Sequence, residues 1–111
     1  ASKTISFKDP KLFAFVEEVC SVLELNGPCD MDFFMKDGEY YLSEINPRFG
    51  GAYLHAYGAG VDFVKLIVNN ILGKENDSII GNYDEDVIMM MYDAVVITTK
   101  KQLLSDHFDL L

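Results

Sequence analysis

The strongest constraint on this sequence is a pair of extended stretches joined by a short polar turn. Residues 28–35 alternate acidic and apolar side chains, and residues 40–45 resume an extended, aromatic-rich pattern. Between them, residues 36–39 (Lys-Asp-Gly-Glu) favour a tight turn. Pro47 cannot donate a hydrogen bond to a sheet, so it should end the second strand. The pattern predicts a β-hairpin followed by a loop over residues 46–51.

Side chains alternate along a strand, which sorts the polar residues of this hairpin by face. Asp30 and Asp32 share one face of the first strand. By the same rule, Leu42, Glu44 and Asn46 share one face of the second strand. The register between the two strands decides whether these two faces coincide.

The length of the turn sets that register. A three-residue turn pairs Lys36 with Tyr40 and places Asp32 opposite Glu44. A two-residue turn instead pairs Lys36 with Glu39 and moves Glu44 to the other face. We predict that Asp32 and Glu44 face the same side.

In that register, the Cβ atoms of Asp32 and Glu44 lie about 4.5–5.5 Å apart, where two like charges destabilise a sheet unless something compensates. A divalent cation is the simplest compensation. Mg²⁺ takes one or two carboxylates and fills its octahedron with other oxygens, so Asp32, Glu44 and the amide oxygen of Asn46 suit it. The alternative is an ordinary hairpin with an exposed polar face.

Arg48 favours the metal interpretation, because a guanidinium beside a metal-bound polyphosphate can stabilise developing phosphoryl charge. Gly50 and Gly51 would let the backbone approach a ligand, and a glycine-rich connection is expected to continue to Gly60. His55, in that connection, either contacts a substrate or phosphate or, as we favour, only makes structural hydrogen bonds.

Asp30 shares the face of Asp32 and has two readings. It can act as a water-mediated outer group of a metal site. It can also be an exposed strand carboxylate, and this reading is favoured.

The remaining elements follow from capping signals and periodicity. A helix should begin at Asp9-Pro10 and end near Asn26-Gly27, and a second should run between Asp62 and Gly73. The apolar, β-branched run of residues 87–99 predicts a strand, and residues 103–111 can form a short closing helix. The predicted class is α+β, with an antiparallel sheet and helices packed on one face.

Composition limits the class of function. Nine basic and eighteen acidic residues give a net charge of −9, which disfavours nucleic acid and anionic membranes as partners. The acidity can serve divalent cations or simply solubility. Cys20 and Cys29 lack metal-ligand spacing and are expected to be reduced core thiols in a cytoplasmic protein. A half-apolar chain of 111 residues is expected to form one compact domain.

Residues 27–34 (GPCDMDFF) and 41–51 (YLSEINPRFGG) together resemble the metal-binding hairpin of ATP-grasp enzymes, with carbamoyl-phosphate-synthase-like members the nearest. In that family an acidic residue or Gln on the first strand, and the Glu and Asn of an E-x-N-x-R segment, hold one or two Mg²⁺ ions against ATP phosphates. The resemblance covers roughly residues 9–73. The match falls on Asp32, Glu44 and Asn46 as metal and ATP contacts, and on Arg48 as an ATP contact and catalytic residue.

The resemblance implies a ligase that uses ATP and Mg²⁺, with Mn²⁺ as an alternative, to activate a carboxylate or bicarbonate as an acyl phosphate. An amine or another nucleophile then attacks this intermediate. Residues 1–111 are expected to be the C-terminal, metal-binding subdomain of an ATP-grasp fold, inactive without the N-terminal half that carries its lysines and Gly-rich loop. Whether the protein forms a homo-oligomer is left undecided by the sequence. The rival hypothesis is a non-catalytic metal-binding or oligomerisation module that retains the fold.

Overall fold

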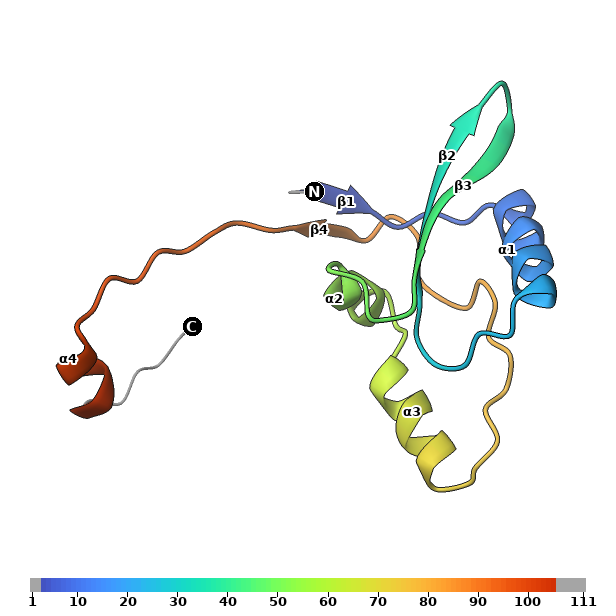
Figure 1. Cartoon of the computed structure of the whole chain (residues 1–111). Helices are drawn as coiled ribbons and strands as arrows, with labels where there is room; N and C mark the ends of the chain where they lie inside the picture. The colour runs from blue at the N-terminus through green and yellow to red at the C-terminus, as the bar shows by residue number, and fades with distance from the viewer. Residues whose placement is uncertain (1–2, 106–111) are drawn as a thin grey trace.

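The computed structural model of the protein describes residues 3–105 and shows a mixed α+β chain (Figure 1). The predicted class and the antiparallel strand pairing are confirmed. The strands, however, form two separate two-stranded pairs instead of one sheet. The elements in chain order are β1 (Lys3–Ile5), α1 (Pro10–Val22), β2 (Asp30–Lys36), β3 (Glu39–Asn46), α2 (Tyr53–Gly58), α3 (Phe63–Ile71), β4 (Ile88–Met90) and α4 (Lys100–Ser105).

The hairpin of β2 and β3 closes through a two-residue turn, so the predicted pairing of Lys36 with Tyr40 is wrong. Lys36 pairs with Glu39, and the turn residues Asp37 and Gly38 both have positive φ, at 53° and 76°. That geometry follows the right-handed twist of the strands, and Asp-Gly is a favoured sequence for it. Next to the turn, the pairing is therefore shifted by one residue from the predicted register.

Helix α1 begins as predicted and packs beside the hairpin. The side chain of Asp9 caps the helix by accepting a hydrogen bond from the backbone N–H of Lys11 at 3.0 Å, and a proline occupies the first turn. The rings of Phe15 and Phe33 meet edge to face, with centroids 5.7 Å apart. This contact places α1 against the face of the hairpin that carries Phe33.

Two further contacts join the start of α1 to the hairpin. Lys11 donates to the carbonyl of Gly38 and forms an ion pair with Glu39 at 3.3 Å. The hydroxyl of Tyr40 donates a hydrogen bond to the carboxylate of Asp9. This bond is the main reason that the pKa of Asp9 is lowered from its ordinary value and that of Tyr40 is raised.

Helix α3 also follows its predicted boundaries. Asp62 accepts a hydrogen bond from the backbone N–H of Lys65 at 3.0 Å, and Gly73 follows the helix with a positive φ of 71°. The glycine-rich connection before α3 was expected to be a loop. Instead, Tyr53–Gly58 within it forms the short helix α2.

Strands β1 and β4 bring together two segments that lie more than 80 residues apart in the sequence. They pair antiparallel, with Lys3 opposite Met90 and Ile5 opposite Ile88. The predicted strand over residues 87–99 is therefore wrong beyond Met90, because the following residues have no ladder partner within the described part of the chain. In Figure 1 they run away from the body toward α4. The closing helix predicted at 103–111 begins earlier, in α4, and residues 106–111 lie outside the described range.

The chain is less compact than expected. The radius of gyration is 18.2 Å, whereas a compact chain of this length has about 13 Å. Among the described residues, only Ala59 is fully buried, at 2% exposure. Tyr92 and Ile97, on the extended segment, are 90% and 92% exposed. The helices and the extended segment thus leave much apolar surface uncovered.

The cysteines and the helices complete this description. Both cysteines are free, but Cys20 is exposed, so the core position expected for it is wrong. Cys29 is partly buried, and this burial raises the pKa of its thiol. Within residues 3–105, no helix has the length and the apolar character that crossing a membrane requires.

The bond between Asp9 and Tyr40 predicts acid sensitivity. Because the folded-state pKa of Asp9 is below its ordinary 3.8, its contribution to stability is present above pH 3.8 and is lost as pH falls through the folded-state value. Tyr40→Phe removes the largest cause of the shift, so its unfolding free energy should depend less on pH in this range. Urea unfolding at a series of pH values measures this, and an unchanged acid slope in the variant would contradict it.

Candidate functional site

The central feature of the site is a β-bulge that restores the predicted pairing. From the turn to Phe33, which pairs with Leu42, the ladder follows the two-residue register. The register then shifts between Asp32 and Phe33, so that Asp32 pairs with Glu44. Ser43 is the extra residue, left without a ladder partner. The predicted position of Asp32 opposite Glu44 is confirmed, although the bulge that produces it was not foreseen.

The bulge also separates side chains that regular alternation would have kept together. Asp32 and Phe33 are consecutive, so their partners Glu44 and Leu42 lie on opposite faces. The predicted placement of Leu42 on the face of Glu44 is therefore wrong. The apolar pair turns toward α1, and the carboxylate pair turns away from it.

The carboxylate face extends one step beyond this pair. Asp30 pairs with Asn46, directly beyond the Asp32–Glu44 pair. Asp32 and Glu44 are exposed, whereas Asp30 and Asn46 are partly buried. Over residues 3–105, the one ion pair is that of Lys11 with Glu39, so no protein cation neutralises this face.

Two unneutralised carboxylates directly across a ladder repel each other. Within the part of the chain that the structure describes, no group of three or more His, Cys, Asp or Glu side chains is arranged to hold a metal. The candidate site does not need three, because Mg²⁺ binds through one or two carboxylates and completes its shell with other oxygens. Asp32, Glu44 and Asn46 match that donor set.

Arg48 lies on the loop that leaves β3. Its backbone N–H donates to the carbonyl of Asn46 at 2.8 Å, which ties the start of the loop to the end of the strand. The guanidinium is exposed, and its Nη1 donates to the carbonyl of Phe49 at 2.8 Å. A guanidinium carries five N–H donors, so this side chain retains donors for an anionic ligand.

A small hollow, which the sequence did not reveal, lies beside the carboxylate face. Its volume is about 150 Å³, and Asp30 contributes to its lining together with the loop and α2. Three aromatic rings line it and contact one another: Phe49, Tyr53 and Phe63. A signal was present in the sequence, as aromatic residues flanking the paired glycines, but only the fold brings them against Asp30.

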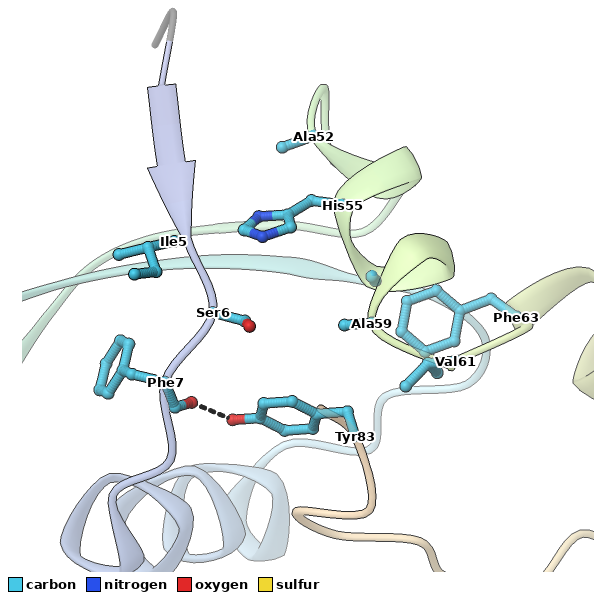
Figure 2. Close-up of a pocket in the computed structure, with 10 residues that line it drawn as sticks. Ile5, Ser6, Phe7, Ala52, His55, Ala59, Val61, Phe63 and Tyr83 are labelled. Atoms are coloured by element: carbon cyan, nitrogen blue, oxygen red, sulfur yellow. Dashed lines mark hydrogen bonds between the residues drawn. The ribbon is translucent and has the colours of Figure 1, made fainter. Parts of the chain in front are cut away.

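His55 has a structural position in a second hollow, of about 380 Å³, between α2 and the N-terminal strand segment (Figure 2). Its Nδ1 is 3.0 Å from the hydroxyl of Thr4, and its Nε2 is 2.6 Å from the carbonyl oxygen of Val87. Because a carbonyl only accepts, Nε2 carries a proton. The favoured structural role of His55 is confirmed, and the ring joins α2 to β1 and to the residue that precedes β4.

The other polar groups of this larger hollow also have partners. Figure 2 shows Tyr83 donating to the carbonyl of Phe7, and Ser6 donates to the carbonyl of Asp84 at 2.7 Å. The hollow therefore offers mainly apolar surface, which makes it a poorer candidate than the hairpin for phosphate or metal chemistry.

Comparison with known families decides the assignment. Residues 2–92 match the family model described as "ATP-grasp in the biosynthetic pathway with Ter operon". The chain belongs to this ATP-grasp family. The comparison with curated proteins gave no match.

ATP-grasp membership gives the hairpin its context. The match spans both strands, the loop with Arg48, and helices α1 to α3. It supports an ATP-dependent, ligase-like function in general for the protein that carries this chain. The roles of Asp32, Glu44, Asn46 and Arg48 in this ATP-grasp protein stay predictions.

The repulsion across the ladder gives a direct test. Asp32→Asn should raise the thermal stability of the chain in EDTA, by at most about 0.5–1 kcal/mol, because it removes one of two facing charges. The same change should abolish the stabilisation that added MgCl₂ gives the wild type, since binding to the folded state alone stabilises it. Melting curves at increasing MgCl₂ measure both effects.

Asp37→Asn is the matched control, because it removes the same charge at the turn and Asn also tolerates positive φ. It should keep the full response to MgCl₂. The repulsion model would be wrong if Asp32→Asn lowered stability in EDTA while retaining the Mg²⁺ response.

Proposed function

We propose that this chain is the metal-binding part of an ATP- and Mg²⁺-dependent ligase that activates a carboxylate or bicarbonate as an acyl phosphate for attack by an amine or other nucleophile. The proposal includes a carbamoyl-phosphate-synthase-like subtype and a cytoplasmic location. The observation that carries it is the pairing of Asp32 with Glu44, next to Asn46 and on the face turned away from α1.

Three residues of the hairpin would hold the metal in this function. Bound Mg²⁺, or Mn²⁺ in its place, would neutralise charge on the ATP phosphates. Asp32 and Glu44 offer one carboxylate oxygen or more from each strand, and Asn46 offers a neutral oxygen. The bulge at Ser43 puts Asp32 and Glu44 on one face of the hairpin, so both carboxylates lie on the same side before ATP binds.

Arg48 is suited to the reacting phosphoryl group. It lies two residues beyond Asn46, on the loop that leaves β3. Its guanidinium is exposed and retains N–H groups that do not bond to the protein within residues 3–105. A planar fork can donate two parallel hydrogen bonds to phosphate oxygens and stabilise the charge that develops during transfer. We therefore assign it the catalytic role in phosphoryl transfer and in stabilising the acyl phosphate.

The uncovered apolar surface supports the part of the proposal that concerns an N-terminal ATP-grasp half. Val22 at the end of α1 and Ile71 at the end of α3 are each 78% exposed, and the segment after β4 is extended and apolar. Apolar side chains left exposed in this way are available for contact with another part of a protein. A second subdomain, supplying lysines and a Gly-rich loop, would cover some of these side chains and close the phosphate site.

Substitutions in the intact ligase test whether Glu44 and Arg48 take part in the reaction. Glu44→Gln keeps the shape of the side chain but removes charge that holds Mg²⁺, so kcat/KM for ATP should fall by orders of magnitude. Arg48→Lys keeps the charge but loses the planar fork. Because the loss of one preorganised hydrogen-bond donor is costly, kcat/KM for ATP should fall roughly a hundredfold or more. Steady-state phosphate release at saturating Mg²⁺ measures both.

The control for these variants is again Asp37→Asn, which should retain near-normal rates. Circular dichroism establishes that each variant folds like the wild type. Near-normal ligase rates in both Glu44→Gln and Arg48→Lys would contradict the proposed site and favour the non-catalytic module.

A further inference from the structure

Asp30 stands apart from the two carboxylates assigned to the metal. Asp32 and Glu44 are exposed, whereas Asp30 is partly buried and lines the 150 Å³ hollow. Neither Asp32 nor Glu44 contributes to that lining. Because Mg²⁺ usually takes only one or two protein carboxylates, a third in the same face is available for another ligand.

The loop after β3 lies close against the Asp30 carboxylate. A Cβ atom added to Gly50 would lie 2.8 Å from Oδ1 of Asp30 and 3.0 Å from its Cγ. The backbone at Gly50 therefore packs directly against the carboxylate, which a side chain at this position would displace. No Lys, Arg or His forms an ion pair with Asp30 within residues 3–105.

Three aromatic rings, together with small apolar residues, form most of the remaining lining of the hollow. The centroids of Phe49 and Tyr53 are 4.8 Å apart at an interplanar angle of 65°, and those of Tyr53 and Phe63 are 5.6 Å apart and stacked. Aromatic faces attract organic cations, and a carboxylate provides a charged hydrogen-bond acceptor. A hydrated metal ion would find only one charged oxygen ligand here, whereas an ammonium group on a short carbon chain matches both surfaces.

The size of the hollow limits the ligand. A cavity of about 150 Å³ is large enough for a benzene-sized group. An ammonium group with three to six carbon atoms therefore fits, and a nucleotide does not.

From these contacts we infer that Asp30 and the aromatic cluster of Phe49, Tyr53 and Phe63 bind a protonated amine carried by the second substrate of the ligase. This inference rests on the proposed function and narrows its nucleophilic substrate to a molecule that bears an aliphatic ammonium group besides the group that attacks, because a protonated nitrogen has no lone pair for the attack. Asp30 is thus a substrate-binding residue, neither a metal ligand nor an idle strand carboxylate. Asp30 pairs with Asn46, and Phe49 directly follows Arg48 in the chain, so this substrate would bind close to the proposed phosphate site.

The test is a titration of the ¹⁵N-labelled 111-residue chain with n-propylammonium chloride, followed by NMR at constant ionic strength. Signals of the hollow should shift, with a dissociation constant at least about tenfold lower than for the neutral n-propanol. Asp30→Asn should remove most of this preference for the cation. Asp37→Asn, the same change outside the hollow, should leave it intact.

A second variant keeps the inference testable if Asp30→Asn does not fold. Phe49→Leu retains an apolar side chain but loses a π face, so n-propylammonium binding should weaken severalfold while n-propanol binding changes little. Equal affinity of the wild type for the cation and the alcohol would overturn the inference. So would an ammonium response that is unchanged in Asp30→Asn.

A parallel titration with MgCl₂ separates this inference from the proposed function. A Mg²⁺ response at Asp32 and Glu44, without an ammonium response at the hollow, contradicts the amine site alone. An ammonium response without a Mg²⁺ response supports the amine site and contradicts the proposed metal site. Loss of the Mg²⁺ response in Asp30→Asn, with the ammonium response retained, would make Asp30 a metal group and overturn the inference.

Discussion

The pairing of β2 with β3, including the one extra residue at Ser43, is the constraint on which the site depends. It puts Phe33 and Leu42 on the face that meets α1, and Asp32 and Glu44 on the other. A regular ladder in the register of the turn would place Glu44 on the apolar face beside Leu42. The bulge thus lets one hairpin present a packing surface on one face and a pair of carboxylates on the other.

Several local features could be predicted because their causes are local. The caps at Asp9 and Asp62, the stop at Gly73 and the end of β3 before Pro47 depend on residues within a turn of each boundary. The pairing of Asp32 with Glu44 was predicted from charge and pattern, but for an incomplete reason. A two-residue turn and a bulge replace the expected three-residue turn. The serine at position 43 gives no sequence signal for a bulge.

Other features depend on contacts between distant residues, which periodicity does not report. Strand β1 has only three residues and exists because β4 pairs with it from the other end of the chain. Beyond Met90, β-branched residues favour an extended backbone, but a strand also requires a partner. The contact of Asp30 with Gly50 is equally invisible in the sequence, although both residues were already of interest.

In the proposed function, the site is one half of a two-part active site. The carboxylate face, Arg48 and the aromatic hollow lie on the hairpin, the following loop and the neighbouring helices α2 and α3, beside large uncovered apolar surfaces. Closure by a second subdomain would exclude water and strengthen the electrostatic interactions within the site. Metal, phosphoryl group and amine would then meet on one side of the hairpin.

The central claim is that Asp32 and Glu44 share one divalent cation. Its most direct test is a crystal structure of the chain grown with MnCl₂, with anomalous scattering used to locate the ion. The account predicts an anomalous peak within bonding distance of carboxylate oxygens from both residues, on the face opposite the contact between Phe15 and Phe33. Ordered Asp32 and Glu44 side chains with no peak between them at saturating Mn²⁺ would contradict it.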